Sequence, residues 1–411
     1  MAAHPLEIAC LICLGVVGFT YLGYPALIWA CSRLFGRGDA PPERGDDELP
    51  TVSLLIAAHN EELDIEARIL NALAQDYPKG KLEVVIASDG STDGTNEIVR
   101  RYARHGVRLL AYPENRGKAA VLNRSVPELA ADIVVLSDAN THMEPTAVRR
   151  MAARFRDASI GVVCGKLVLV DPRSGQNVDG VYWKYETFLK KCESRLGALL
   201  GANGAIYAIR RRLFPVVRAN TLIDDFVIPL DAKLRSGGRI VYDPGAVAVE
   251  DTAPTMRAEF RRRVRIGAGG YQSIGMLWPL LSPVNGWVAV TFFCHKILRW
   301  VCPFFLLAAL VANAVALGTP SANRLFAVQL GFYALAAVGP VLPARPRVLR
   351  YLRLPAMFVT MNLALFVGFF RWLFGSQSGT WARTERTAPA APPGAPVVDP
   401  DPVQTAPAAG V

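Results

Sequence analysis

The sequence predicts an α/β domain with a mostly parallel sheet, attached to transmembrane and interfacial helices. Three observations lead to this fold class. Hydrophobic residues make up 52% of the 411 residues, which is more than a wholly soluble chain of this length needs. Long apolar runs lie near both ends, and between about residues 50 and 260 short apolar runs alternate with helical patterns. Such alternation is typical of right-handed βαβ units, which form a parallel sheet covered on both faces.

The first predicted element is an N-terminal transmembrane helix within residues 1–35. Leu6 to Cys31 is long enough and apolar enough to cross a bilayer, which takes roughly 20 residues. Arg33 and Arg37 follow this stretch and no basic residue precedes it, so we expect a span and not a cleaved signal peptide. The positive-inside rule then places the N-terminus outside and the soluble domain, residues 48–270, in the cytoplasm.

The soluble domain contains four predicted strands, each bounded by turn residues. They are Val52–Ala57, Leu82–Ala87, Val107–Ala111 and Ile133–Leu136. Helical patterns follow the first three strands, over residues 61–75, over residues 96–104 and from the segment NRGKAAVLNRSV. In a parallel sheet of this kind, ligands bind beyond the carboxyl ends of the strands.

The C-terminal third is predicted to return to the membrane. Residues 271–296 mix Trp278 and Trp287 with basic and apolar residues, which suits interfacial helices, although ordinary core packing is an alternative. Within residues 297–375 three apolar stretches are long enough to span: Ile297–Leu317, Leu325–Leu342 and Leu354–Phe374.

The side of the C-terminal tail stays open at this point. Three crossings would place it outside, whereas Arg371, Arg383 and Arg386 favour the cytoplasm, so a re-entrant last segment is the alternative. Residues 387–411 are dominated by Pro, Ala and small polar residues, and we expect this tail to be disordered.

Charge and cysteine content exclude other classes of protein. The net charge of +10 is explained by arginines that flank apolar segments. Anionic lipid or a diphosphate would complement this positive charge, so it does not indicate a nucleic-acid partner. The seven cysteines are scattered, with neither a disulfide framework nor the spacing of a zinc site.

Polar residues gather at the ends of the predicted strands. Those that stand out are His59, Asn60, Glu61, Asp89, Lys118, Asp138 and Asn140. Each alone is compatible with an ordinary turn or helix cap. Together they offer acceptors for a base and ribose, a lysine and oxygen ligands for a divalent ion, which are the groups that bind a nucleotide diphosphate. Neither GxGxxG nor a Walker A motif is present, so a dinucleotide or an ATP P-loop is unsupported.

A set of motifs in this region resembles a known family. AAHNEE, ASDGSTDGT, NRGKAAVLN, SDAN, GANGAIYAIRR and LIDDF follow one another as they do in family 2 inverting glycosyltransferases. The likeness is strongest to membrane-embedded cellulose-synthase-like and hyaluronan-synthase-like enzymes, and it covers roughly residues 50–275. It implies a Rossmann-like GT-A fold, a UDP-sugar donor and a divalent cation, Mg²⁺ or Mn²⁺.

The resemblance also implies roles for the residues at the strand ends. Glu61 and Asp89 would bind uracil and ribose, with Ala57, His59 and Asn60 in the same motif and Lys118 near the nucleotide. Asp138 begins the DxD turn that holds the metal in this family.

The last residue of that turn departs from the pattern, because Asn140 stands where a carboxylate is common. Asn offers one neutral carbonyl oxygen where Asp offers a charged group, so it should hold a hard cation less tightly. We therefore expect Asn140 to act as a weaker metal ligand when nucleotide is bound. The alternative is a capping residue in a metal-poor site.

The family places its catalytic base at the Asp that closes an ED motif, which corresponds here to Asp225 beside Asp224. Such a base takes the proton of the acceptor hydroxyl as that oxygen attacks. Paired carboxylates can raise one another's pKa, which would favour this role, whereas a plain helix N-cap is the alternative.

Three further segments match the family less fully. Arg262 and Arg265 stand where a QxxRW motif supplies an arginine to the diphosphate, but the tryptophan of that motif is absent. Gly201 and Gly204 match the segment that lines the acceptor site, where they would leave room for a sugar. Trp381, Thr384 and Arg386 resemble a gating segment, within residues 376–386, that closes over the nucleotide; an interfacial anchor is the alternative.

Three functions follow from this sequence. The leading hypothesis is a multi-pass inner-membrane enzyme, in contact with membrane lipid, that extends an extracellular or capsular polysaccharide from a UDP-sugar, with or without an export or synthase partner. The second is a single-addition glycosyltransferase that acts on a lipid carrier or membrane lipid, which the missing tryptophan favours. The third is a non-catalytic, nucleotide-sugar-binding subunit of a synthase, for which Asn140 is the best support.

Overall fold

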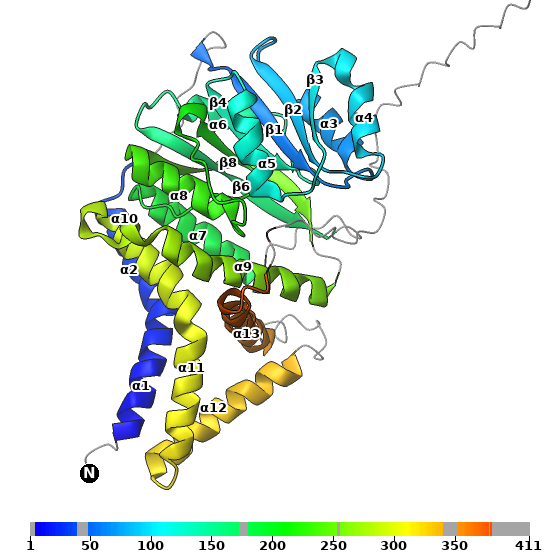
Figure 1. The fold of residues 1–411 in the computed structure, drawn as a ribbon. Helices are drawn as coiled ribbons and strands as arrows, with labels where there is room; N and C mark the ends of the chain where they lie inside the picture. Colours follow the sequence, from blue (N-terminus) through cyan, green and yellow to red (C-terminus); the bar gives the residue numbers. More distant parts are fainter. Residues whose placement is uncertain are drawn as a thin grey trace, which may run out of the picture.

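The structure, a computed structural model, describes residues 5–38, 48–171, 180–252, 255–339, 352–377 and 379. A sheet domain sits above a group of long helices (Figure 1). The predicted gating residues Trp381, Thr384 and Arg386 and the tail 387–411 lie outside the described residues.

The predicted parallel half of the sheet is confirmed. It consists of β1 (Val52–Ala58), β2 (Leu82–Asp89), β3 (Val107–Tyr112) and β4 (Ile133–Asp138). These strands are parallel to one another in the order β3-β2-β1-β4. The four carboxyl ends therefore meet at one edge of the sheet, as βαβ connections require.

The second half of the sheet is of mixed direction. Beyond β4 the order continues β7-β6-β8-β5, which completes an eight-stranded sheet. These strands are β5 (His142–Met143), β6 (Ile160–Val170), β7 (Tyr207–Arg210) and β8 (Arg239–Asp251). β7 runs antiparallel to both of its neighbours, β6 is parallel to β8, and β5 adds a short antiparallel edge.

Helices cover both faces of this sheet and divide the core in two. α3 (Ile65–Leu73), α4 (Thr95–Arg101) and α6 (Ala147–Arg154) cover one face, and α5 (Lys118–Ser125), α7 (Val181–Arg195) and α8 (Asp224–Ser236) lie on the other. Alternate residues of β1 show the division, because Leu54 and Ile56 belong to the first core and Leu55 and Ala57 to the second. Each core is formed by buried apolar side chains, which supply most of the stabilisation of the domain.

Three of the long helices are long and apolar enough to cross a membrane, among the residues that the structure describes. They are Pro5–Leu34, Trp287–Val315 and Leu354–Leu373. The first comprises α1 (Pro5–Gly18), one π-helical turn and α2 (Tyr24–Leu34), and the last is α13. The predicted stretch Leu325–Leu342 falls mainly on α12 (Pro320–Val338), which is not among these three helices.

The predicted interfacial region has a different subdivision. α9 (Met256–Met276) crosses its start, two short 3₁₀ turns follow, and the helix that contains Ile297 already begins at Trp287. That helix is built from α10 (Trp287–Thr291), a π-helical segment and α11 (Leu298–Val315).

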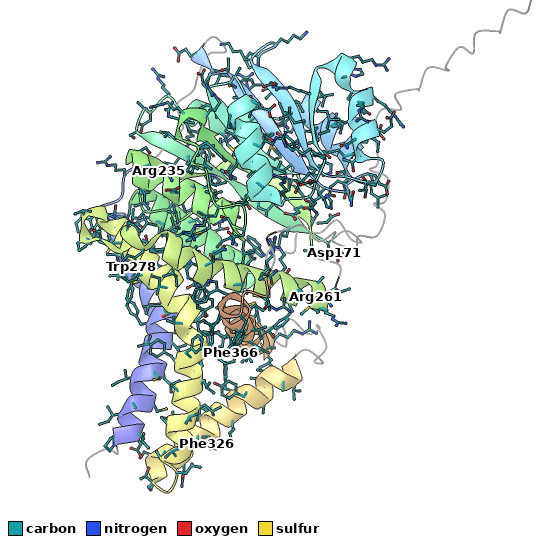
Figure 2. All side chains as sticks on the ribbon, viewed as in Figure 1. Asp171, Arg235, Arg261, Trp278, Phe326 and Phe366 are labelled. Carbon is teal, nitrogen blue, oxygen red and sulfur yellow. The ribbon has the colours of Figure 1, made fainter. Side chains whose placement is uncertain are left out.

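α9 lies between the sheet domain and the apolar helices (Figure 1) and packs tightly against α13. A Cβ added to Gly368 of α13 would come within 2.8 Å of the Ala268 backbone nitrogen on α9. Only glycine permits this approach, so the two helices touch backbone to backbone. Phe366 of α13 also packs against Phe304 of α11, with ring centroids 5.4 Å apart (Figure 2).

A buried polar cluster joins the sheet domain to two of the apolar helices. Glu193 of α7 accepts hydrogen bonds from Tyr24 of α2 at 2.7 Å and from His295 at 2.6 Å. Glu186, two turns earlier on α7, forms an ion pair with Arg299 of α11. Leaving one such buried charge without its partner costs several kcal/mol, so these contacts hold the domain to its helical base.

Candidate active site

The strand register brings the predicted site residues to one edge of the sheet. Ala57 of β1 lies level with Ala87 of β2 and with Asp138 of β4. Asp89 ends β2 and Asp138 ends β4, so both carboxylates leave the sheet at this edge.

The loop after β1 is fastened to the loop after β2. Asn60 adopts a left-handed backbone conformation with φ 55°. Its side-chain oxygen accepts a hydrogen bond from the Thr92 backbone nitrogen at 2.8 Å, and the Glu61 backbone nitrogen donates to Thr95 Oγ1 at 2.8 Å. His59 Nε2 accepts from Asn115 at 3.0 Å, so Nδ1 carries the hydrogen and donates to the Asp89 carbonyl oxygen at 2.6 Å. His59 and Asn60 therefore position these loops.

Asp89 is buried and holds the turn that precedes α5. Its two carboxylate oxygens accept hydrogen bonds from the backbone nitrogens of Arg116 at 2.9 Å and of Gly117 at 2.7 Å. Gly117 needs its glycine here, because its φ is 90°. The role of Asp89 toward a nucleotide stays a prediction, whereas its role in fixing the turn 116–118 is a contact of the structure.

Lys118, the last residue of that turn, sits between two carboxylates. Its ammonium lies 2.5 Å from Asp138 Oδ1 and 3.7 Å from Asp224 Oδ2. Burial alone would lower the pKa of Lys118, but the charges of Asp138 and Asp224 overcome this and raise it. Lys118 is therefore a fixed cation at the edge of the sheet.

The two acidic residues of α8 have different surroundings. Asp224 is buried, and this burial, together with the charges of Asp225 and Asp138, raises its pKa in spite of Lys118. Asp225 Oδ2 accepts a hydrogen bond from the Gly204 backbone nitrogen at 3.0 Å. The N-cap of α8 is Ile223, so the capping interpretation of Asp225 is wrong.

Gly201 and Gly204 make room for α8. A Cβ added to Gly204 would lie 3.2 Å from Asp225 Oδ2, and one added to Gly201, whose φ is 77°, would lie 2.9 Å from the Phe226 ring. The structure therefore explains both glycines by the close approach of Asp225 and Phe226. Their predicted contact with an acceptor sugar stays a prediction.

Asn140 contacts a residue that the motifs did not indicate. Its side-chain nitrogen donates to Glu250 Oε1 at 2.9 Å. Glu250 lies near the end of β8, and the antiparallel pairing of β5 with β8 brings it opposite the turn 138–141. Asn140 is not a helix cap, because α6 begins at Ala147 with Thr146 as its N-cap.

Comparison with known proteins agrees with this arrangement. Residues 53–214 match the family model described as glycosyl transferase family 2. The family model thus assigns residues 53–214 to glycosyltransferase family 2. The matched residues hold β1 to β7, apart from the first residue of β1, and all the contacts of the turn 116–118 except that with Asp224.

Two curated relatives match part of the chain. The chain is 29% identical over 248 residues to a poly-beta-1,6-N-acetyl-D-glucosamine synthase of Staphylococcus aureus, which covers 56% of this chain and 57% of that protein. It is 26% identical over 239 residues to a probable glycosyltransferase of Bacillus subtilis, with 54% and 56% covered. The chain thus aligns with a little more than half the length of these curated relatives.

A solved structure shares the fold. A mannosyltransferase of Pyrobaculum calidifontis, solved in complex with GDP-Man and Mn²⁺, superposes with a TM-score of 0.69 at 24% identity. The match covers 90% of this chain and all of that one. The predicted GT-A fold class is therefore confirmed.

Arg68 of α3, like Glu250, is a residue of the site that the sequence motifs did not indicate. It is fully buried and donates hydrogen bonds to the Ser137 hydroxyl at 3.1 Å and to the Asp138 carbonyl oxygen at 3.4 Å. Burial lowers its pKa to about 9, against the opposing charge of Asp138. An arginine within an otherwise apolar helical pattern is the signal that could have pointed to it.

Arg262 and Arg265 of α9 are not brought into this group. Both are exposed, and within the described part of the chain no hydrogen bond or ion pair joins them to Asp138 or Asp224. Arg261, the preceding residue, marks this end of α9 in Figure 2. Their predicted contact with a diphosphate stays a prediction.

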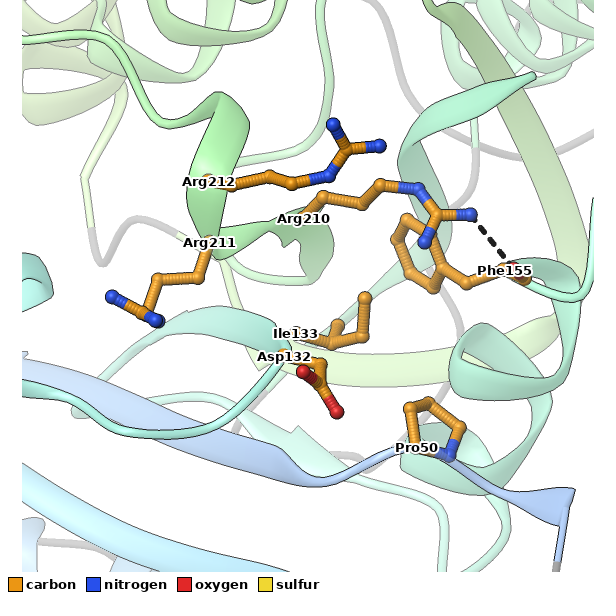
Figure 3. Close-up of a pocket in the computed structure, with 7 residues that line it drawn as sticks. All are labelled: Pro50, Asp132, Ile133, Phe155, Arg210, Arg211 and Arg212. Atoms are coloured by element: carbon orange, nitrogen blue, oxygen red, sulfur yellow. Dashed lines mark hydrogen bonds between the residues drawn. The ribbon is translucent and has the colours of Figure 1, made fainter. Parts of the chain in front are cut away.

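A pocket of about 330 Å³ lies at the opposite edge of the sheet (Figure 3). Pro50 and Asp132, which line it, precede β1 and β4, so it opens at the amino ends of the strands. Its Arg210 donates to the backbone carbonyl oxygens of Phe155 at 2.7 Å and of Ile160 at 2.8 Å. This arginine has a structural role, and the pocket is separate from the candidate active site.

Proposed function

We propose that this protein is a membrane-bound inverting glycosyltransferase that transfers a sugar from a UDP-sugar to a growing extracellular or capsular polysaccharide. The observation that carries the proposal is the turn 116–118. Its backbone binds Asp89, and its lysine contacts both Asp138 and Asp224. Groups from four separate segments of the chain thus meet at one site, as a nucleotide-sugar site requires.

The donor set at this site suits a divalent cation beside a diphosphate. The ammonium of Lys118 at 2.5 Å from Asp138 Oδ1 indicates that positive charge is favourable there. Asp138 and the amide oxygen of Asn140 are hard oxygen donors of the kind that Mg²⁺ and Mn²⁺ prefer. A metal bound by them would neutralise charge on the diphosphate, and the similar mannosyltransferase was solved with Mn²⁺.

Asp225 is the proposed general base. The acceptor hydroxyl oxygen forms a bond to the anomeric carbon while the bond from that carbon to the diphosphate oxygen breaks. The hydroxyl proton passes to the Asp225 carboxylate, and the nucleoside diphosphate leaves with the electron pair of the broken bond. The Gly204 N–H at 3.0 Å would hold the carboxylate in place for this transfer.

The proposed location is the inner membrane, with the catalytic domain in the cytoplasm. The three apolar helices and the arginines after the first of them support this location. Cytoplasmic UDP-sugars and the lipids of the inner leaflet would then lie on the same side as the site.

The acceptor is proposed to be a polysaccharide because the Staphylococcus aureus relative is a polysaccharide synthase. The second candidate is a single addition to a lipid carrier, and one observation favours it. Ile266 is exposed on α9 where the family motif has a tryptophan that contacts the acceptor. Both functions use the same donor site, and they differ in the acceptor.

The test is product length. Membranes with the overexpressed protein are incubated with a panel of radiolabelled UDP-sugars, beginning with UDP-N-acetylglucosamine, and the products are separated by size. A ladder of products supports polysaccharide extension, whereas one discrete lipid-soluble product supports the second function. The control is Asp225→Asn, which should abolish transfer while leaving UDP affinity within about three-fold. Undiminished turnover of this variant would rule out Asp225 as the base.

A further inference from the structure

Glu250 faces the one position where the metal-binding turn departs from its family. Asn140 Nδ2 lies 2.9 Å from Glu250 Oε1, and both side chains are half-buried. The two residues come from different segments at this edge of the sheet, since Asn140 lies in the turn before β5 and Glu250 belongs to β8.

The chemistry of this contact fixes the orientation of an amide. An ionised carboxylate only accepts hydrogen bonds, so Asn140 must turn its NH₂ group toward Glu250. The Asn140 carbonyl oxygen therefore points away from Glu250. An unconstrained Asn could present either group to a cation, and only the oxygen can bind one.

The same contact explains why position 140 is not Asp. A carboxylate there would stand about 3 Å from the Glu250 carboxylate, and two like charges at that distance repel one another strongly in a half-buried site. The negative charge that a DxD turn has on its last residue is thus carried here by Glu250 of β8.

We propose that Glu250 is a positioning residue that makes Asn140 an oxygen ligand, so that the pair replaces the second carboxylate of the turn. This inference rests on the proposed function, because it assumes a divalent cation beside the diphosphate. Glu250 acts by holding the ligand, as residues behind a metal ligand commonly do, and their loss typically lowers metal affinity by about 10- to 100-fold.

The test is a double-mutant cycle with Asn140→Asp, Glu250→Gln and the double variant in the detergent-purified full chain. The first measurement is Mn²⁺ binding in the presence of saturating UDP. It is monitored by the electron paramagnetic resonance signal of free Mn²⁺. In the native background Glu250→Gln should weaken binding about 10-fold, because Gln can donate as well as accept and no longer fixes the Asn140 amide. In the Asn140→Asp background the same substitution should cost less than about three-fold, because a carboxylate presents oxygen in either orientation.

The second measurement is thermal unfolding without metal. Asn140→Asp alone should lower the apparent Tm, and Glu250→Gln should restore it, because the Gln amide can donate to the new carboxylate. Recovery of the double variant after the single one fails to fold would also support the pairing. Equal losses of Mn²⁺ affinity in both backgrounds, or a loss of Tm that Glu250→Gln does not relieve, would overturn it.

Sugar transfer, measured on the same preparations, separates the two proposals. Transfer by the native protein with an uncoupled cycle rejects the Glu250 inference alone. A coupled cycle without transfer of any UDP-sugar rejects the proposed function and leaves the pairing of the two residues standing.

Discussion

At the scale of single residues, the candidate site concentrates negative charge around one cation. Asp138 and Asp224 both contact Lys118, and Asp225 follows Asp224 on α8. Grouped carboxylates of this kind serve a ligand and weaken the protein that carries them. The stability of the ligand-free protein should therefore respond to the removal of one of these charges.

Asp224→Asn is expected to stabilise the ligand-free protein and to reduce transfer at least 100-fold. Burial raises the pKa of Asp224, which means that its charged form is disfavoured in the folded state relative to the unfolded state. The destabilisation is present at pH values above the raised pKa and disappears as the pH falls through it. The variant should melt on the order of 2 °C higher than the native protein at pH 8, and this gap should close toward acidic pH.

The control for this prediction is Asp231→Asn on the same helix. Asp231 is paired with Arg235 at 2.9 Å near the surface, so removing its charge should leave Tm unchanged or slightly lower it at pH 8. A gap between Asp224→Asn and the native protein that does not vary with pH would contradict the electrostatic origin.

At the scale of secondary-structure elements, α9 connects the loop before α8 with the apolar helices. Gln272 donates to the Asn220 carbonyl oxygen at 3.0 Å and accepts from the Leu222 backbone nitrogen at 3.0 Å. These two contacts hold both sides of Thr221, shortly before Asp224 and Asp225. On the same helix, a Cβ added to Gly269 would come within 2.8 Å of the Ile223 side chain.

Gln272→Leu should therefore lower kcat by about 10-fold and change the KM for the donor by less than about two-fold, because the loop that orients Asp225 loses its two hydrogen bonds. A tenfold fall in kcat corresponds to an activation free energy that is higher by about 1.4 kcal/mol. The substitution keeps the size of the side chain and removes both hydrogen bonds to the loop. Gly275→Ala is the matched control on α9, because nothing lies within 4 Å of its added Cβ. The measurement is steady-state kinetics with the UDP-sugar of the panel that is transferred fastest. A rise in KM without a fall in kcat would contradict the prediction and assign Gln272 to donor binding.

At the scale of the whole molecule, the parallel half of the sheet could be predicted from sequence and the mixed half could not. β1 to β4 are apolar runs, and helical patterns follow the first three of them, which is a local signal. β5 has two residues, β7 has four, and β6 and β8 pair across about 80 residues, so their positions depend on contacts that periodicity does not record.

The candidate site divides in the same way. Asp138, Lys118 and the acidic pair of α8 follow from motifs, because each stands at the end of a strand or the start of a helix. Glu250 and Arg68 act through distant neighbours, Asn140 and Asp138, and neither is part of a motif that the sequence displays. Residues that hold other residues are the ones that sequence reasoning missed.

The path of the chain after α13 bears on the side of the C-terminal tail, which arginine counts left undecided. An added Cβ on Gly379 would lie 3.1 Å from the Asn220 Cα, so the chain beyond α13 returns to the catalytic domain. α11 leads away from that domain, α12 rises back toward α13, and α13 lies close beneath α9 (Figure 1). One return through the membrane region is enough for this path, so the C-terminus should be on the same side as the catalytic domain. Single cysteines placed at Ser376 and, as the reference, at exposed Arg235 of α8 in a cysteine-free background would be labelled with a membrane-impermeant maleimide. Both cysteines should react in inside-out vesicles, and neither should react in intact spheroplasts. Opposite labelling of the two positions would show that the chain crosses the membrane three times after the catalytic domain, and the C-terminal tail could then not reach the nucleotide.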